Sequence, residues 1–219
     1  MNVDDRYLVW QLVAGKRTYS VLRWDRDFIK RSSGSLAEIW PAAAFCVLDA
    51  SPGAGEPLLP DCLLNTEQSL LISSDLKQAL VEANVDNVEF WPLKIIDRTG
   101  RSLGQPYFFV HLLNTPDCLD LDASGATRSR LFPGMAEKVQ RLVFARDPER
   151  HLFSPRTFSS VTFLSWELAG LLAKGGFSGF RFMGLFDYGI KGDLPPHPAR
   201  YKVDALCNEN FKNNLARRP

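Results

Sequence analysis

The sequence has few of the residues that build metal sites and disulfide frameworks. Its 219 residues include only four cysteines and three histidines. The cysteines lie far apart, without a CxxC pair or a histidine at zinc-ligand spacing, so no structural zinc site is indicated. They are Cys46, Cys62, Cys118 and Cys207. We expect them to be reduced, buried apolar side chains, and we expect the protein to carry no metal and no cofactor.

Long hydrophobic runs are lacking as well. The longest nearly apolar stretch, residues 40–48, is far shorter than the ~20 residues that a membrane-spanning helix needs. The first residues include Asp4 and Asp5, where a signal peptide would be basic. These features predict a cytoplasmic protein that is neither exported nor held at a membrane.

Motifs of common catalytic chemistry are missing too. There is no P-loop and no GxGxxG segment. Ser178 lies in a near match to the GxSxG nucleophile elbow, but Phe180 occupies the place of the last glycine, so we interpret the segment as a turn. The DxDxSG segment that starts at Asp120 resembles a calcium loop, yet Leu131 stands where the bidentate glutamate belongs. We expect a turn there, in which Asp and Ser side chains bind backbone amides.

The chain is therefore predicted not to be an enzyme, with two alternatives left open. One is a small cytoplasmic hydrolase or transferase of unknown substrate, in which Cys118 pairs with His111 or His151 as a base. The other is a nucleic-acid-binding regulator. Acidic residues interleave the arginines between 128 and 156, which argues against the basic stripe that nucleic acid requires.

What the sequence does contain is the composition of a globular protein, with 45% apolar and 23% charged residues. Runs of aromatic and β-branched residues predict strands at 7–13, 19–24, 45–48, 88–97 (interrupted by Pro92), 107–113 and 139–144. We predict one α+β domain: a mixed, mostly antiparallel sheet packed with a few short helices. A loop at 51–60, with three prolines and two glycines, ends an N-terminal β-rich portion (1–60) of the same fold. The main α+β region follows (61–190), and then a Pro-rich basic tail, loosely held (191–219).

A strand-helix-strand pattern occurs twice, at about 70–90 and 162–182, with matching residue types 92 positions apart. In each copy an apolar segment ends in a serine, Ser73 or Ser165, that suits a helix N-cap, and an acid follows in the first turn. Leucines at helical spacing come next. Asn84 and Gly176 then offer residue types that tolerate a left-handed cap. We expect an internal repeat.

Charge is unevenly distributed, although the net charge is only +1. Residues 1–100 carry −4 and residues 101–219 carry +5, while 61–97 alone holds seven acids and two bases. An acidic surface of this kind favours encounter with a basic partner, although a solvated helix face would give the same pattern. The residues we predict to contact a partner are Asp75, Glu82, Asp86 and Glu89, together with Asp117, Asp120 and Asp122 in a later loop.

Four segments of the sequence form a distinctive series: the Ser-acid helix with 88–93, then 107–114, 118–124 and 152–182. They resemble those of immunity family eleven of bacterial polymorphic-toxin systems, the family of myxobacterial kin-discrimination immunity proteins. The resemblance implies an immunity protein that binds a cognate antibacterial toxin, such as a nuclease delivered by type VI secretion, and blocks its active site. It implies a protein partner and no catalytic residues. The sequence leaves a homodimer open.

Overall fold

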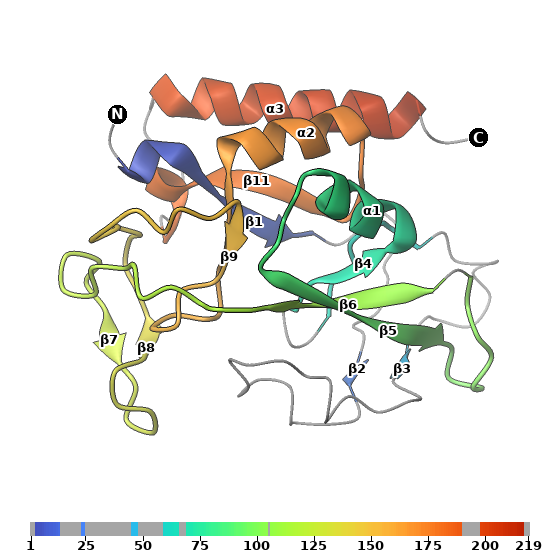
Figure 1. Ribbon diagram of the computed structural model, residues 1–219, viewed down its shortest axis with the longest axis horizontal. Helices are drawn as coiled ribbons and strands as arrows, with labels where there is room; N and C mark the ends of the chain where they lie inside the picture. The colour runs from blue at the N-terminus through green and yellow to red at the C-terminus, as the bar shows by residue number, and fades with distance from the viewer. Residues whose placement is uncertain are drawn as a thin grey trace. The chain divides into compact units, whose positions relative to one another are not determined.

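The computed structural model describes residues 3–13, 23–24, 45–47, 59–65, 69–104, 106–189 and 198–216. Most of the strand predicted at 19–24 and of the loop predicted at 51–60 lies outside these residues. The chain divides into two compact units, each built from separated stretches (Figure 1). Unit 1 comprises 1–11, 115–176 and 181–219, and unit 2 comprises 12–114 and 177–180.

Unit 2 is organised around a five-stranded sheet. Its strand order is β2 (Arg23–Trp24), β3 (Phe45–Val47), β5 (Val88–Ile96), β6 (Tyr107–Leu112), β4 (Leu71–Ser73). β6 runs antiparallel to both of its neighbours, and β3 runs parallel to β5. The nearly all-apolar sequence of β6 suits this central position, where Tyr107, Phe109 and Val110 are all buried.

The prediction that Pro92 interrupts its strand is wrong, because β5 runs unbroken from Val88 to Ile96. Pro92 lies opposite Phe108 of β6. On its other side β5 pairs with β3 only from Lys94 onward. Proline is tolerated where its missing N–H would face outside the ladder, and this position lies before the stretch that β3 covers.

The helix of unit 2, α1 (Ser74–Glu82), packs on β4 and β6. Ser73 is its N-cap, and the Ser73 hydroxyl accepts a hydrogen bond from the Leu76 amide (3.3 Å). Leu76 and Leu80 form the fully buried stripe. Asn84 follows the helix with φ +53°, the left-handed backbone expected after a helix end.

Unit 1 contains a four-stranded sheet with the order β11 (Phe180–Gly184), β1 (Tyr7–Leu12), β10 (Thr162–Ser165), β9 (Leu152–Phe153). β10 is antiparallel to β1 and β9. The core beside this sheet is aromatic. The Phe144 ring lies 5.2 Å from that of Phe163 and 5.5 Å from that of Tyr7, both edge to face.

Unit 1 differs from prediction at 139–144, which is irregular and not a strand. Val139, Leu142 and Phe144 are buried there, so the apolar spacing that predicted a strand does report burial. A two-stranded hairpin, β7 (Thr127–Arg128) and β8 (Ala136–Lys138), precedes this segment. Short 3₁₀ turns occupy Val3–Arg6 (η1) and Leu185–Asp187 (η3).

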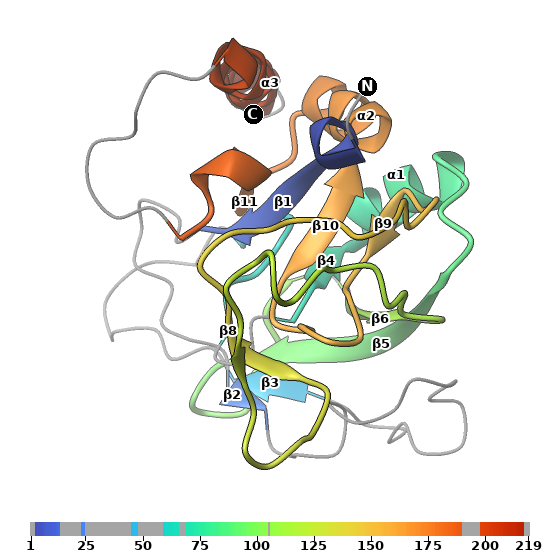
Figure 2. The same ribbon diagram turned by 90° about the vertical axis from the view of Figure 1, so that its left-hand side faces the viewer.

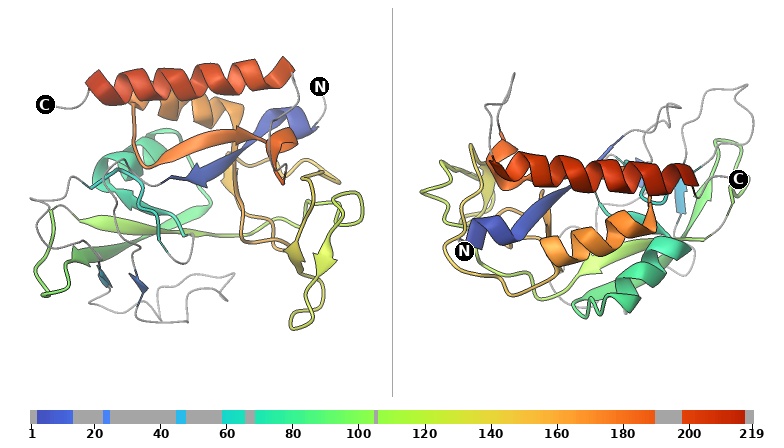
Figure 3. Two further views of the ribbon diagram at one scale, coloured as in Figure 1. Left: turned by 180° about the vertical axis from the view of Figure 1, so that it is seen from behind. Right: turned by 90° about the horizontal axis from the view of Figure 1, so that it is seen from above.

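Two helices of unit 1 lie side by side, α2 (Trp166–Gly175) and α3 (Pro198–Ala216) (Figure 3). Ser165 caps α2 through the Leu168 amide (3.2 Å), and Gly176 ends it with φ +64°. The expectation of a loosely held tail is wrong for α3. Asn213 Nδ2 donates to the Ala173 carbonyl of α2 (3.1 Å), and Val203 is buried.

The two predicted strand-helix-strand segments have the same sheet order. β4 and β5 flank β6, and α1 connects them; β10 and β11 flank β1, and α2 connects them. In each unit the helix therefore links two strands separated by one strand from elsewhere in the chain. The internal repeat itself stays a prediction.

The α+β class and the mostly antiparallel pairing are confirmed. Among the helices of the described ranges, none combines the length and the apolar character that crossing a bilayer demands.

Candidate partner-binding surface

Three of the predicted acids are exposed on or beside α1. Asp75 and Glu82 are seven residues apart, which is two helical turns, so they share one side of the helix. Glu82 Oε1 accepts a hydrogen bond from Gln78 Nε2 (3.0 Å). Asp86 follows in the loop to β5 and is also exposed. We call Asp75, Glu82 and Asp86 the α1 acidic surface.

The fourth acid predicted in this segment has a structural role. Glu89 is half-buried at the start of β5, and its Oε2 accepts a hydrogen bond from Trp91 Nε1 (3.0 Å). Nearby, Lys77 of α1 lies over the Phe108 ring, with Nζ 4.1 Å from the centroid. The ammonium group of Lys77 is thus held against an aromatic face of the five-stranded sheet.

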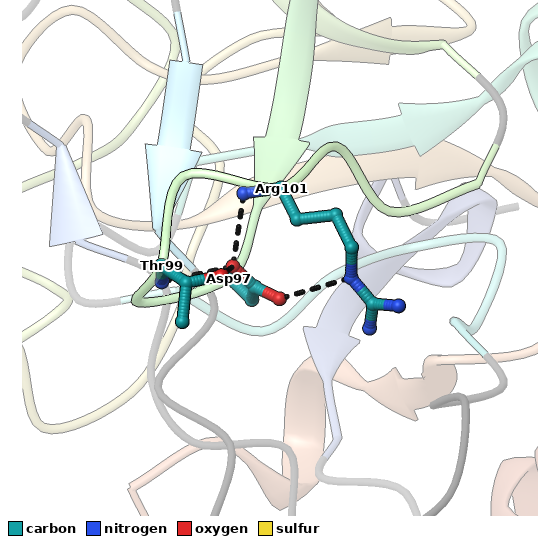
Figure 4. Close-up of polar contacts among 3 residues, drawn as sticks. All are labelled: Asp97, Thr99 and Arg101. Atoms are coloured by element: carbon teal, nitrogen blue, oxygen red, sulfur yellow. Dashed lines mark hydrogen bonds and ion pairs between the residues drawn. The ribbon is translucent and has the colours of Figure 1, made fainter.

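Two further acids of residues 61–97 stabilise local backbone. Asp97 closes the turn between β5 and β6 (Figure 4): its Oδ1 accepts from Thr99 N (2.9 Å), Thr99 Oγ1 (2.6 Å) and Arg101 N (3.0 Å). Its Oδ2 accepts from Arg101 Nε (3.2 Å). The hydrogen bond from the Thr99 hydroxyl, with the backbone amides beside it, lowers the pKa of Asp97 to about 2.

Asp61 clamps three segments of unit 2 together. Its Oδ1 accepts from the Ser73 hydroxyl (3.0 Å), and its Oδ2 accepts from both the amide and the hydroxyl of Ser178 (2.9 Å each). The N-cap of α1 is thereby tied to residues 177–180. Ser178 also accepts from the Asp61 amide (3.0 Å), so its hydroxyl serves this clamp, in agreement with the predicted turn.

The acids predicted in the later loop are surrounded by arginines of unit 1. Asp122 pairs with Arg128 Nη2 (3.0 Å), and Asp117 lies 3.7 Å from Arg156 Nη2. Asp120 Oδ1 accepts from the Ala123 amide (2.9 Å), which is the turn expected for this segment. Within the described ranges no cluster of His, Cys, Asp or Glu could hold a metal ion. Arginines thus lie beside Asp117 and Asp122, whereas Asp120 stabilises the turn.

Three of the four cysteines are buried, and Cys207 is half-buried. Cys46 and Cys118 are fully buried, and burial raises the pKa of each to about 12. Burial also raises the pKa of Cys207. A thiolate nucleophile needs a lowered pKa, and Cys118 has the opposite.

Two of the three histidines lie among the described residues, and both have structural surroundings. His111 is buried in β6, and its ring stacks on that of Phe109 at 6.2 Å. His151 Nδ1 lies 2.9 Å from the hydroxyl of Ser165. That hydroxyl also accepts a hydrogen bond from the Leu168 amide, so it acts as the N-cap of α2.

One exposed feature of the structure was not predicted from the sequence. Leu131 and Phe132, at the tip of the β7–β8 hairpin, are 80% and 45% exposed. The only sequence signal is a short apolar pair before Pro133 and Gly134, a turn signature that does not indicate exposure.

These features define an α+β protein that presents charged and apolar surfaces, with its cysteine thiols and Ser178 held in structural roles. The chain belongs to the Immunity protein family (Imm11), whose sequence model matches residues 25–185. No curated protein matches the chain. The family predicted from sequence is confirmed.

Proposed function

We propose that the protein is an immunity protein that binds a cognate antibacterial toxin and neutralises it by covering its active site or substrate groove. The observation that carries the proposal is the family match over residues 25–185. The protein would act without catalysis, in the cytoplasm of the cell that produces the toxin. A nuclease toxin delivered by type VI secretion is the partner we favour.

The α1 acidic surface supports a basic partner groove. A nuclease binds the phosphate backbone through Lys and Arg, so its substrate groove is positively charged. Asp75, Glu82 and Asp86 are exposed carboxylates within a short stretch of unit 2. Complementary charge of this kind accelerates encounter and orients the partners more than it adds to final affinity.

The buried thiols support a role without catalysis. The pKa of the Cys118 thiol, raised to about 12, leaves it protonated at neutral pH, and the Ser178 hydroxyl is held by Asp61. Neither group is prepared to act as a nucleophile. The proposal therefore depends on surfaces, and its test is binding.

The direct test combines the purified protein with an inactivated form of the toxin encoded by the neighbouring open reading frame. We expect a tight one-to-one complex, and growth rescue when the active toxin and this chain are expressed together. A wild-type protein that neither binds the toxin nor rescues growth would refute the proposal.

A pair of charge-reversal variants tests the acidic surface. Asp75→Lys with Glu82→Lys should slow association at low salt by about tenfold or more, and added salt should reduce the difference. The matched control is Asp204→Lys with Glu209→Lys, two exposed acids of α3 that give the same change in net charge. Equal slowing by both variants would show that net charge, and not this surface, is what matters.

A further inference from the structure

The loop of the β7–β8 hairpin is a closed turn. Its base is fixed where the Ser129 amide donates to the Met135 carbonyl (2.8 Å), and its tip where the Met135 amide donates to the Phe132 carbonyl (3.0 Å). The Ser129 hydroxyl accepts from the amides of Leu131 and Phe132 (3.3 Å each). Figure 2 shows the hairpin extending away from β9 and β10 within unit 1.

This closed turn presents two large, exposed apolar side chains. Leu131 is 80% exposed and Phe132 45% exposed, and Pro133 beside them is exposed as well. The hydrogen bonds described above use the backbone of the loop and the Ser129 hydroxyl, so they leave the Leu131 side chain on the surface. Apolar side chains on a preorganised loop lose little conformational entropy on binding, which is the property of an interface anchor.

The charges beside the tip are mainly basic. Residues 127–138 include Arg128, Arg130 and Lys138 against one acid, Glu137. All four of these side chains are exposed; Arg128 pairs with Asp122, and Arg130, Lys138 and Glu137 together leave one net positive charge. A surface that accepts this hairpin would therefore need an apolar centre and an acidic rim.

We infer that the Leu131–Phe132 tip is an anchor that enters an apolar, acid-rimmed pocket on the cognate toxin. The inference rests on the proposed function and specifies a second contact, of opposite charge to the α1 acidic surface. A protein pocket fits the tip better than a lipid surface does. The tip is a short, fixed turn with two exposed bases beside it, whereas membrane attachment draws on broader apolar faces and larger clusters of basic residues.

The test compares Leu131→Ser with Phe132→Ser, as a double variant, with the wild type. The probe is the inactivated toxin of the neighbouring open reading frame, with dissociation followed by surface plasmon resonance. Loss of a central apolar anchor should weaken the complex by about thirty-fold or more, mainly through faster dissociation. The matched control is Leu171→Ser, which removes a 50% exposed leucine from α2 and should leave the affinity unchanged.

The outcomes separate this inference from the proposed function. If the wild type binds the toxin and the tip variant binds equally well, the anchor is refuted and the immunity role stands. If the wild type does not bind, both fail. The anchor is also refuted if Leu171→Ser weakens binding as much, or if the tip variant changes only the oligomeric state. A change confined to binding of phosphatidylethanolamine–phosphatidylglycerol vesicles would refute it too. Unchanged thermal unfolding of the tip variant checks that it folds.

Discussion

Replacement of Gly179 by alanine should destabilise unit 2 strongly. Gly179 follows the Asp61–Ser178 clamp and has φ +91°, a backbone conformation that residues with a Cβ rarely adopt. A Cβ on this residue would lie 1.8 Å from the Cys62 carbonyl oxygen and 2.8 Å from the Cys62 carbonyl carbon. Both atoms belong to the backbone, so no side-chain rotation relieves the clash.

The expected loss in the free energy of unfolding follows from the backbone displacement that the added Cβ requires. The backbone at Cys62 and Gly179 would have to separate by about 1.6 Å for the 1.8 Å contact to reach an ordinary distance. Two backbone hydrogen bonds are most exposed to this displacement: Cys62 N to Ser178 O (2.9 Å), which lies beside the Asp61–Ser178 clamp, and Val13 N to Gly179 O (3.1 Å), which ties Gly179 to Val13. Losing both costs about 2 kcal/mol, and the positive φ adds about 1–2 kcal/mol. We expect a total loss of about 3–4 kcal/mol in the free energy of unfolding.

The same substitution at Gly170 provides a control of opposite sign. Gly170 lies inside α2, and a Cβ there would meet nothing within 4 Å. Alanine should therefore stabilise the helix by about 0.5–1 kcal/mol. In thermal unfolding we expect Gly179→Ala to lower Tm by about 6–15 °C and Gly170→Ala to raise it by about 1–4 °C. A Gly179→Ala protein that unfolds at the wild-type temperature would refute the close approach to Cys62.

Two further predictions concern titratable groups. Burial raises the pKa values of Cys46 and Cys118 to about 12. Iodoacetamide at neutral pH should therefore label these thiols only after unfolding, as measured by mass spectrometry. Rapid labelling of the folded protein would contradict this prediction. The pKa of Asp97, lowered to about 2, means that its turn gains stability above the unfolded pKa near 4 and loses it as pH falls toward 2. In an NMR titration Thr99→Val should raise that pKa, and a wild-type value near 4 would count against the hydrogen bonds drawn in Figure 4.

The parts of the fold that sequence predicted well are those decided by local chemistry. Ser73 and Ser165 begin helices because a serine hydroxyl can accept a first-turn amide, and both do so. Gly176 ends α2 in the left-handed conformation that glycine adopts without strain. The apolar run of β6 indicated a buried strand, and β6 lies between β5 and β4 with four of its six residues buried.

The parts that were missed depend on tertiary contacts. Val139, Leu142 and Phe144 are buried as an irregular segment, which apolar spacing cannot distinguish from a strand. Pro92 fits inside β5 only because β3 begins to pair beyond it. Helix α3 lies in a polar, proline-flanked stretch whose sequence pattern does not predict a helix. Its stability comes from packing on α2.

The candidate surface could be predicted only in part, for a related reason. Charge counting found the acidic segment, but it could not separate exposed carboxylates from those that stabilise the fold. Asp61 accepts hydrogen bonds from Ser178, and Asp97 accepts them within its turn. Glu89 accepts a hydrogen bond from the indole of Trp91. Exposure, and not charge, selects Asp75, Glu82 and Asp86 from that set.

The two strand-helix-strand segments show where a binding surface can change without cost to the scaffold. Leu76 and Leu80 of α1 correspond to Leu168 and Leu172 of α2 in sequence spacing, and all four are buried. At the exposed position where α1 has Glu82, α2 has Lys174, the opposite charge. Because the buried leucines suffice for each helix to pack, the sign of the exposed charge is free to follow the partner. Asp75 and Glu167 are both acids in the first turn, where the helix dipole favours negative charge, so Glu82 and Lys174 are the positions at which the exposed charge differs.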